Sequence, residues 1–105
     1  MTFDISKIAI PKEPGIYLMK DAKEEIIYIG KAKNLKNRVK SYFLKNQNYK
    51  TQKLVSKIAD IEFVLTDNES EAFLLESNMI KRYRPTYNIE LKDQQRYTYL
   101  RVTNE

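Results

Sequence analysis

A chain of 105 residues with 42% hydrophobic content is long enough for one compact core and too short for two ordinary domains, so we expect a single domain over residues 1–105, with its core at about residues 11–102. The chain has neither cysteine nor histidine, which excludes disulfides, zinc–thiolate sites and histidine-based catalysis and leaves Tyr, Lys, Glu or Asp for any hydrolytic chemistry. The net charge of +5 favours a polyanionic partner, and both nucleic acid and an anionic membrane fit that description.

Two short strands are predicted near the N-terminus. A Pro-Gly turn that ends at Gly15 precedes an apolar, β-branched run at residues 16–20, and a second such run follows at residues 26–30. The short polar connection between them predicts a β-hairpin. With a loop of about four residues, Tyr17 would lie opposite Tyr28, and both phenols would leave the same face of the sheet.

Two amphipathic segments and a third strand follow. Asn34 is a suitable N-cap for a helix over residues 35–43, in which apolar residues recur at helical spacing. The same spacing predicts a helix over residues 50–58, and the apolar run at residues 61–65 predicts a strand.

The clearest helix signal lies in the second half of the chain. Asn68 and Glu71 form a capping-box signature, and the helix should extend to Tyr83 or Arg84, just before Pro85. Beyond it we predict a polar loop over residues 86–96 and a final strand over residues 97–102. The fold class expected is therefore α+β, with a small central antiparallel sheet of three or more strands, the β-hairpin first, flanked by helices.

The last predicted helix carries a carboxylate on its apolar side. At 100° per residue, Glu76 lies near the middle of an arc formed by Ala72, Leu75, Met79, Ile80 and Tyr83. A buried, unpaired carboxylate is costly, so Glu76 should form an ion pair, be protonated, or bind a metal at the rim of a cleft. For an isolated glutamate the ion pair is the commoner outcome.

Two further pairs of residues are candidates for phosphate binding. Arg38 and Tyr42 lie four residues apart on one face of a predicted helix and could clamp a phosphate, or Arg38 could pair with an acid while Tyr42 covers the core. Gly30 ends a strand directly before Lys31, where a missing side chain would let a backbone or phosphate approach closely. A plain turn glycine and a solvated lysine are the ordinary alternative.

Five segments together resemble the GIY-YIG nucleases. They are Gly15-Ile16-Tyr17, Tyr28-Ile29-Gly30, residues 31–39, residues 71–76 and residues 84–88, in the order and spacing of that family. The resemblance is nearer to the UvrC type than to homing or restriction members and covers about residues 11–102. Residues 93–98 depart from the usual family pattern. The resemblance implies the GIY-YIG nuclease fold.

It also implies a set of functional residues. The catalytic residues would be Tyr17, Tyr28, Lys31, Arg38, Tyr42, Glu76 and Asn88, with Glu76 as the metal ligand and Gly15 and Gly30 at points of close approach. DNA would be contacted by Lys31, Lys33, Lys36, Arg38, Lys40 and Arg84. A single divalent cation, Mg²⁺ or Mn²⁺, suits a site without histidine or a carboxylate cluster.

Roles follow for the polar side chains of this set. A free phenol has a pKa of about 10, so a tyrosine becomes a plausible base only where Lys31 or the metal lowers that pKa. Tyr28 is the first choice and Tyr17 the second. Tyr42 would orient the attacking water or a phosphate oxygen, and Asn88 would fix the loop near Glu76 or contact DNA.

The function implied is the 3′-side incision of a damaged strand in nucleotide excision repair. The expected partners are damaged double-stranded DNA and, through a longer chain of which this would be an N-terminal fragment, UvrB. We expect a monomeric domain in the cytoplasm, because the sequence has no secretory signal and no apolar run of the roughly 18 residues that span a membrane.

Three alternatives stay open at this point. One is a stand-alone GIY-YIG nuclease that acts on a branched or damaged duplex, and another is a non-catalytic DNA-binding module that uses its basic residues only for phosphates. The third, a basic membrane-surface protein, would need a helix with large exposed apolar residues, whereas we expect the helices to be fully used in one core.

Overall fold

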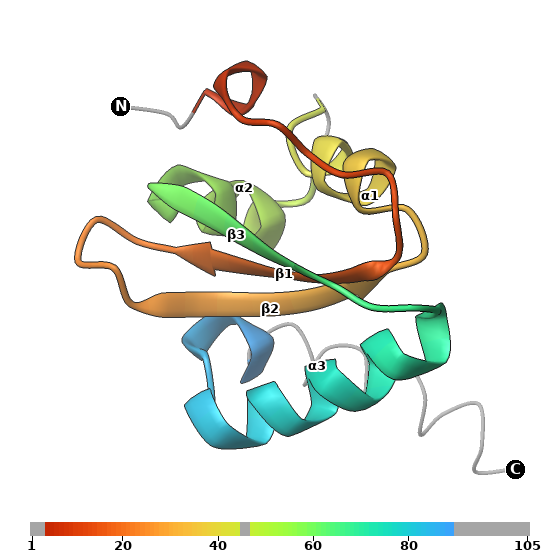
Figure 1. Ribbon diagram of the computed structural model, residues 1–105. Helices are drawn as coiled ribbons and strands as arrows, with labels where there is room; N and C mark the ends of the chain where they lie inside the picture. Colours follow the sequence, from red (N-terminus) through yellow and green to blue (C-terminus); the bar gives the residue numbers. More distant parts are fainter. Residues whose placement is uncertain (1–3, 45–46, 90–105) are drawn as a thin grey trace, which may run out of the picture.

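The computed structural model describes residues 4–44 and 47–89, in which a three-stranded antiparallel sheet carries helices on both faces (Figure 1). The strands are β1 (Gly15–Lys20), β2 (Ile26–Ala32) and β3 (Asp60–Leu65), in the spatial order β2-β1-β3. The predicted β-hairpin, the third strand and the α+β class are confirmed. β2 and β3 are the edge strands of this sheet.

The register of the hairpin differs from the prediction. Tyr17 pairs with Gly30, and Tyr28 pairs with Met19, so the two tyrosines do not lie directly opposite each other. The connection is longer than assumed, because the pairing skips Ile27 of β2 after Met19 and the turn places Glu24 at a φ of 65°. The register shift is two residues, which preserves the alternation of side chains, so both phenols still leave the same face.

One face of the sheet is covered by α1 (Leu35–Ser41) and α2 (Tyr49–Lys57), with the short 3-10 helix η1 (Ile5–Lys7) beside them (Figure 1). We call it the α1 face. The side chains of Asn34 and Asn48 accept hydrogen bonds from the first turns of the two helices and so fix where they begin. The core on this side is large and includes Tyr17, Met19, Leu35, Val39, Tyr42, Leu54, Ile58 and Ile61.

The opposite face, here called the α3 face, is covered by α3 (Glu69–Tyr83). Asn68 accepts a hydrogen bond from the Glu71 amide, and the Glu71 side chain accepts one from the Asp67 amide, as the capping signature predicts. The helix ends at Arg84, which adopts a left-handed conformation ahead of a proline. A small cluster is buried beneath it, made of Ile16, Leu18, Ile29 and Ala72.

The expectation that the helices would be fully used in one core is wrong. The sheet separates two clusters, and α3 covers its face with a narrow stripe, leaving Phe73 53% and Leu74 62% exposed. Tyr83, predicted on the apolar arc, is 47% exposed. The acidic first turn of α3, with Glu69 and Glu71, suits an anionic membrane poorly. In the part of the chain that the structure describes, no helix has both the length and the apolar character to cross a membrane.

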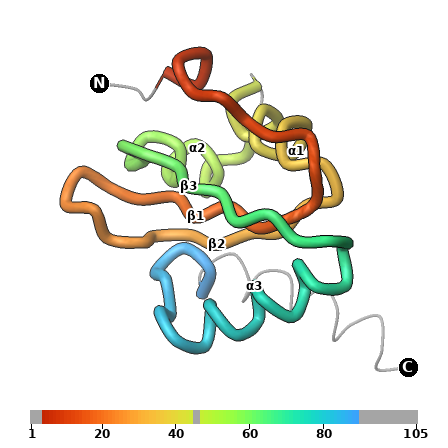
Figure 2. The backbone as a smooth tube through the Cα atoms, viewed as in Figure 1, coloured from red at the N-terminus to blue at the C-terminus, as the bar shows by residue number. Residues whose placement is uncertain are grey.

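The predicted loop after α3 begins as a helical turn instead. Residues 86–89 are helical, and Pro85, which cannot continue α3 but suits a helix start, is buried before them. This turn lies close to β2 and brings Tyr87 and Asn88 into the interior (Figure 2). The predicted strand at residues 97–102 lies outside the described residues.

Candidate active site

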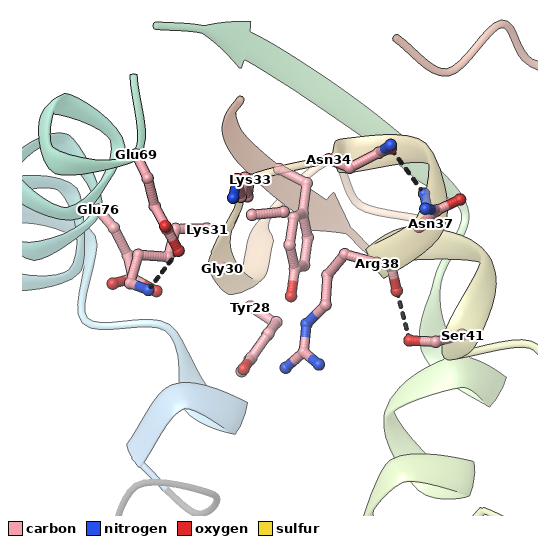
Figure 3. Close-up of a pocket in the computed structure, with 12 residues that line it drawn as sticks. Tyr28, Gly30, Lys31, Lys33, Asn34, Asn37, Arg38, Ser41, Glu69 and Glu76 are labelled. Carbon is pink, nitrogen blue, oxygen red and sulfur yellow. Dashed lines mark hydrogen bonds and ion pairs between the residues drawn. The ribbon is translucent and has the colours of Figure 1, made fainter. Parts of the chain in front are cut away.

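An open pocket of about 690 Å³ lies at the edge of the sheet beside β2. Side chains from α1, β1, β2 and α3 line it (Figure 3). Among the predicted site residues, the pocket brings together Tyr17, Tyr28, Gly30, Lys31, Lys33, Arg38 and Glu76.

The pocket wraps around an edge strand and joins the two faces of the sheet. Tyr17 and Tyr28 reach it from the α1 face, while Lys31 leaves β2 towards α3, where its Nζ lies 3.7 Å from Glu69 Oε2. Glu76 reaches the pocket from α3 and is half-buried. Phenols and Arg38 from the α1 face therefore meet Lys31 and Glu76 from the α3 face across the edge of β2 (Figure 3).

Gly30 is the point of closest approach, but its neighbour is not the predicted one. A Cβ placed on Gly30 would overlap the end of the Tyr17 ring. The missing side chain therefore makes room for the phenol of the paired strand. Gly15 is similarly constrained, since a Cβ there would overlap the Val64 carbonyl oxygen of β3.

Three tyrosines form a compact triangle on the α1 face. The hydroxyls of Tyr17 and Tyr42 are hydrogen-bonded at 2.7 Å. The ring centroid of Tyr28 lies 6.2 Å from that of Tyr17 and 6.1 Å from that of Tyr42. The guanidinium carbon of Arg38 lies 5.4 Å from the Tyr42 ring centroid. Tyr17 and Tyr42 are buried and Tyr28 is half-buried, so the packing fixes the direction of each hydroxyl.

Burial controls the acidity of these phenols. It raises the pKa of Tyr17 to about 12, with a further increase from Tyr28, while the hydrogen bond with Tyr42 and the charge of Arg38 lower it by less. Burial also raises the pKa values of Tyr28 and Tyr42, again against a smaller lowering effect of Arg38. The cation that opposes burial is thus Arg38 rather than Lys31, and the protein alone keeps all three phenols protonated near neutral pH.

The predicted DNA-contacting residues do not form one surface. Lys31, Lys33 and Arg38 line the pocket. Lys36 and Lys40 lie on a different side of α1 from Arg38, because positions two apart point in nearly opposite directions. Arg84 lines another depression, beside Glu24 and Glu25 at the hairpin turn.

The side chain of Asn88 is hydrogen-bonded to the backbone of β2. Its Oδ1 accepts a hydrogen bond from the Ile29 amide at 2.7 Å, and its Nδ2 donates one to the Ile29 carbonyl at 2.8 Å. The side chain is buried. Asn88 therefore holds the segment between Tyr28 and Gly30, and neither of the roles predicted for it, near Glu76 or on DNA, describes these contacts.

Sequence reasoning missed one acidic residue of the pocket. Glu69 lines it together with Glu76. The seven-residue spacing of the two, which places them on one side of a helix, was the signal available. Among the described residues no group of three or more acidic, histidine or cysteine side chains is close enough to form a metal cage. One or two carboxylates with water suit a hard cation such as Mg²⁺.

Comparison with known proteins gives consistent matches. Residues 13–89 match the model of the UvrC-like GIY-YIG domain. The UvrABC system protein C of Clostridium tetani is 50% identical over 103 residues, covering 96% of this chain and 17% of that protein. Its counterpart in Desulfitobacterium hafniense is 55% identical over 96 residues, covering 91% of this chain and 16% of that protein. The chain thus spans about a sixth of the length of these curated relatives.

A solved structure matches the fold. It is the GIY-YIG N-terminal endonuclease domain of UvrC from Thermotoga maritima, bound to its catalytic divalent cation, magnesium. The TM-score is 0.69 at 46% sequence identity, covering 74% of this chain and 85% of that chain.

Proposed function

The chain belongs to the family of UvrC-like GIY-YIG domains, and on that basis we propose that it is a metal-dependent DNA endonuclease domain that makes the 3′-side incision in a damaged strand during nucleotide excision repair. The observation that carries the proposal is the pocket at the edge of β2. Phenols from one face of the sheet and the carboxylates of Glu69 and Glu76 with the ammonium of Lys31 from the other line it together, with Arg38 from α1. This set can bind a phosphodiester and move a proton without histidine or cysteine.

A divalent cation fits the donor set of this pocket. Glu76 would hold Mg²⁺ or Mn²⁺, with water completing the coordination, as Mg²⁺ prefers. When bound, the cation supplies charge stabilisation to the phosphate and the leaving 3′ oxygen and lowers the pKa of a coordinated water.

The protein's own side chains would bind the phosphate, accept the proton and position one another. Arg38 would bind the non-bridging oxygens of the scissile phosphate, since its planar guanidinium can donate two parallel hydrogen bonds. Tyr28, which is less buried than Tyr17, is the first candidate to accept the proton of the attacking water, and Tyr17 the second. Because burial raises the pKa of both phenols, either could act as a base only as the phenolate, which a cation bound in the pocket would favour. Tyr42 would orient Tyr17 through their 2.7 Å hydrogen bond. Asn88 would act by holding β2 in place.

The partners proposed are damaged double-stranded DNA and, through the full-length protein, UvrB. Lys31, Lys33 and Arg38 would contact phosphates near the cut, and Lys36 and Lys40 phosphates further along the duplex. The cytoplasm is the proposed location.

The experiment is an incision assay on a lesion-bearing duplex with full-length protein and UvrB in Mg²⁺, comparing wild type with Glu76→Ala. Losing a metal ligand should reduce the 3′-side cut by about a hundredfold or more, while DNA binding and the far-UV circular dichroism stay unchanged. Glu62→Ala, an acidic residue of β3 outside the pocket, is the matched control. Undiminished cutting by Glu76→Ala would exclude its role as a metal ligand. DNA binding without any cutting by wild type would favour a non-catalytic module.

A further inference from the structure

The two acidic residues in the first turn of α3 have separate uses. Glu71 accepts a hydrogen bond from the Asp67 amide at 3.0 Å and so belongs to the helix cap. Glu69 points to the pocket instead, where its Oε2 lies 3.7 Å from Lys31 Nζ. The helix cap accounts for the orientation of the Glu71 side chain. The orientation of the Glu69 side chain is accounted for by its ion pair with Lys31.

Lys31 is held from two sides by α3. Its ammonium is paired with Glu69 and lies 6.0 Å from the ring centroid of Phe73, one turn further along the helix. The lysine side chain is 33% exposed and that of Glu69 is 52% exposed, so this is an ion pair at the wall of the pocket. A lysine without such neighbours would spread over many rotamers.

The arrangement separates Lys31 from Arg38, two of the three cationic side chains that line the pocket. Glu69 and Glu76 lie two helical turns apart on one side of α3, and Figure 3 shows Lys31 beside them, with Tyr28 between this group and Arg38. The ammonium therefore stands on the α3 side of the phenols, and the guanidinium stands on the α1 side.

We propose that Glu69 is a positioning residue, which holds the ammonium of Lys31 on the α3 wall so that Lys31 and Arg38 reach the scissile phosphate from opposite sides. This inference rests on the proposed function. Glu69 acts through Lys31 and does not touch the substrate. Because Glu69 is itself negative and lines the pocket, it would weaken phosphate binding while it orders the lysine.

Because Glu69 orders Lys31 but weakens phosphate binding, its removal should lower kcat without raising KM. In Glu69→Gln, kcat for the 3′-side incision should fall about tenfold, the scale on which supporting residues act. KM for the DNA should stay equal or decrease, because a negative charge has been removed near the phosphates. A general loss of folding would lower the active fraction equally in all assays, and loss of a DNA contact would raise KM.

A double-mutant cycle tests whether the effect passes through Lys31. In a Lys31→Ala background, Glu69→Gln should cause no further fall in kcat. A full additional tenfold loss there would overturn the proposal. So would an unchanged kcat in the single variant, or a rise in the Mg²⁺ concentration needed for half-maximal incision, which would make Glu69 a metal ligand.

A readout without catalysis uses a second ion pair, outside the pocket, as its control. Lys20 Nζ lies 2.8 Å from Glu62 Oε2, away from the pocket. Trace acetylation of the full-length protein, followed by mass spectrometry, reports the reactivity of each lysine. Glu69→Gln should raise the reactivity of Lys31 about twofold, as expected for a weak exposed pair, and leave Lys20 unchanged. Glu62→Gln should raise the reactivity of Lys20 and leave that of Lys31 unchanged.

The two proposals fail in different ways. Absence of incision by wild type overturns the proposed function. Normal incision by wild type, with an unaltered kcat or an unaltered Lys31 reactivity in Glu69→Gln, overturns only the role of Glu69.

Discussion

The two faces of the sheet differ in how tightly they are closed. On the α1 face two helices bury a large apolar cluster, and the phenols of Tyr17 and Tyr42 are part of it. On the α3 face a single helix covers a small cluster and leaves Phe73 and Leu74 largely exposed. The charged residues Lys31 and Glu69 are on this more open side.

The difference matches what each face contributes to the pocket. Buried phenols have fixed positions and raised pKa values, so they can serve as a rigid, neutral platform. Ammonium and carboxylate groups need water or a ligand nearby, and a half-open face provides it at little desolvation cost. The pocket thus combines a rigid side and a solvated side, and three predictions test this division.

The largest expected effect comes from making the same substitution on each face. Leu54 of α2 is fully buried, whereas Leu74 of α3 is 62% exposed. Leu54→Ala should reduce the free energy of unfolding by about 3 kcal/mol because it leaves a cavity. Leu74→Ala should change it by less than about 0.5 kcal/mol. Urea denaturation followed by circular dichroism measures both, and equal losses would contradict the comparison.

A substitution at Gly30, on the strand between the two faces, should reduce the free energy of unfolding almost as much. Gly30→Ala would force the buried Tyr17 ring to move, at a cost of about 2 to 3 kcal/mol in the free energy of unfolding. The near-ultraviolet circular dichroism of the tyrosines should change as well. In a Tyr17→Leu background the same substitution should cost much less, because the overlapping phenol is gone. An equal cost in both backgrounds would show that the strain arises elsewhere.

The closed face should also give the protein a sensitivity to alkaline pH. An unfolded tyrosine ionises near its ordinary pKa of 10.0, whereas folded Tyr17 has a pKa of about 12. Between these values the unfolded chain releases a proton that the folded chain retains. Stability is therefore complete below pH 10 and decreases as pH rises to 12, by about 2 kcal/mol for this group.

The measurement for this effect is urea denaturation at several pH values, together with the absorbance of tyrosinate. Tyr17→Phe should show a shallower decrease in stability than wild type over the same pH range. A slope identical to that of wild type would mean that Tyr17 ionises freely in the folded protein.

Local patterns in the sequence predict most of the fold. The cap at Asn68, the proline after α3 and the alternation in the hairpin act over a few residues, so they can be read directly. The register of Tyr17 was wrong because it depends on the irregularity after Met19, which no residue type signals. The helical turn at residues 86–89 was missed because four residues are too few to show a helical periodicity.

The site was predictable in part, and for a different reason. The family resemblance predicts that four residues surround one pocket, namely Tyr17, Tyr28, Arg38 and Glu76. Their spacing alone was equally compatible with ordinary ion pairs and core packing. The hydrogen bonds between Asn88 and Ile29 join residues that are 59 positions apart in the sequence. Such a contact cannot be predicted from a local sequence pattern. The catalytic roles of these residues stay predictions until the incision assays are done.

The contact of Asn88 with Ile29 has a consequence for the behaviour of the protein in solution. β2 is an edge strand, and the outward N–H and C=O of an edge strand can pair with a strand of another molecule. The side-chain amide of Asn88 occupies both groups of Ile29. The Asn88 side chain therefore blocks edge-to-edge pairing with another strand at Ile29.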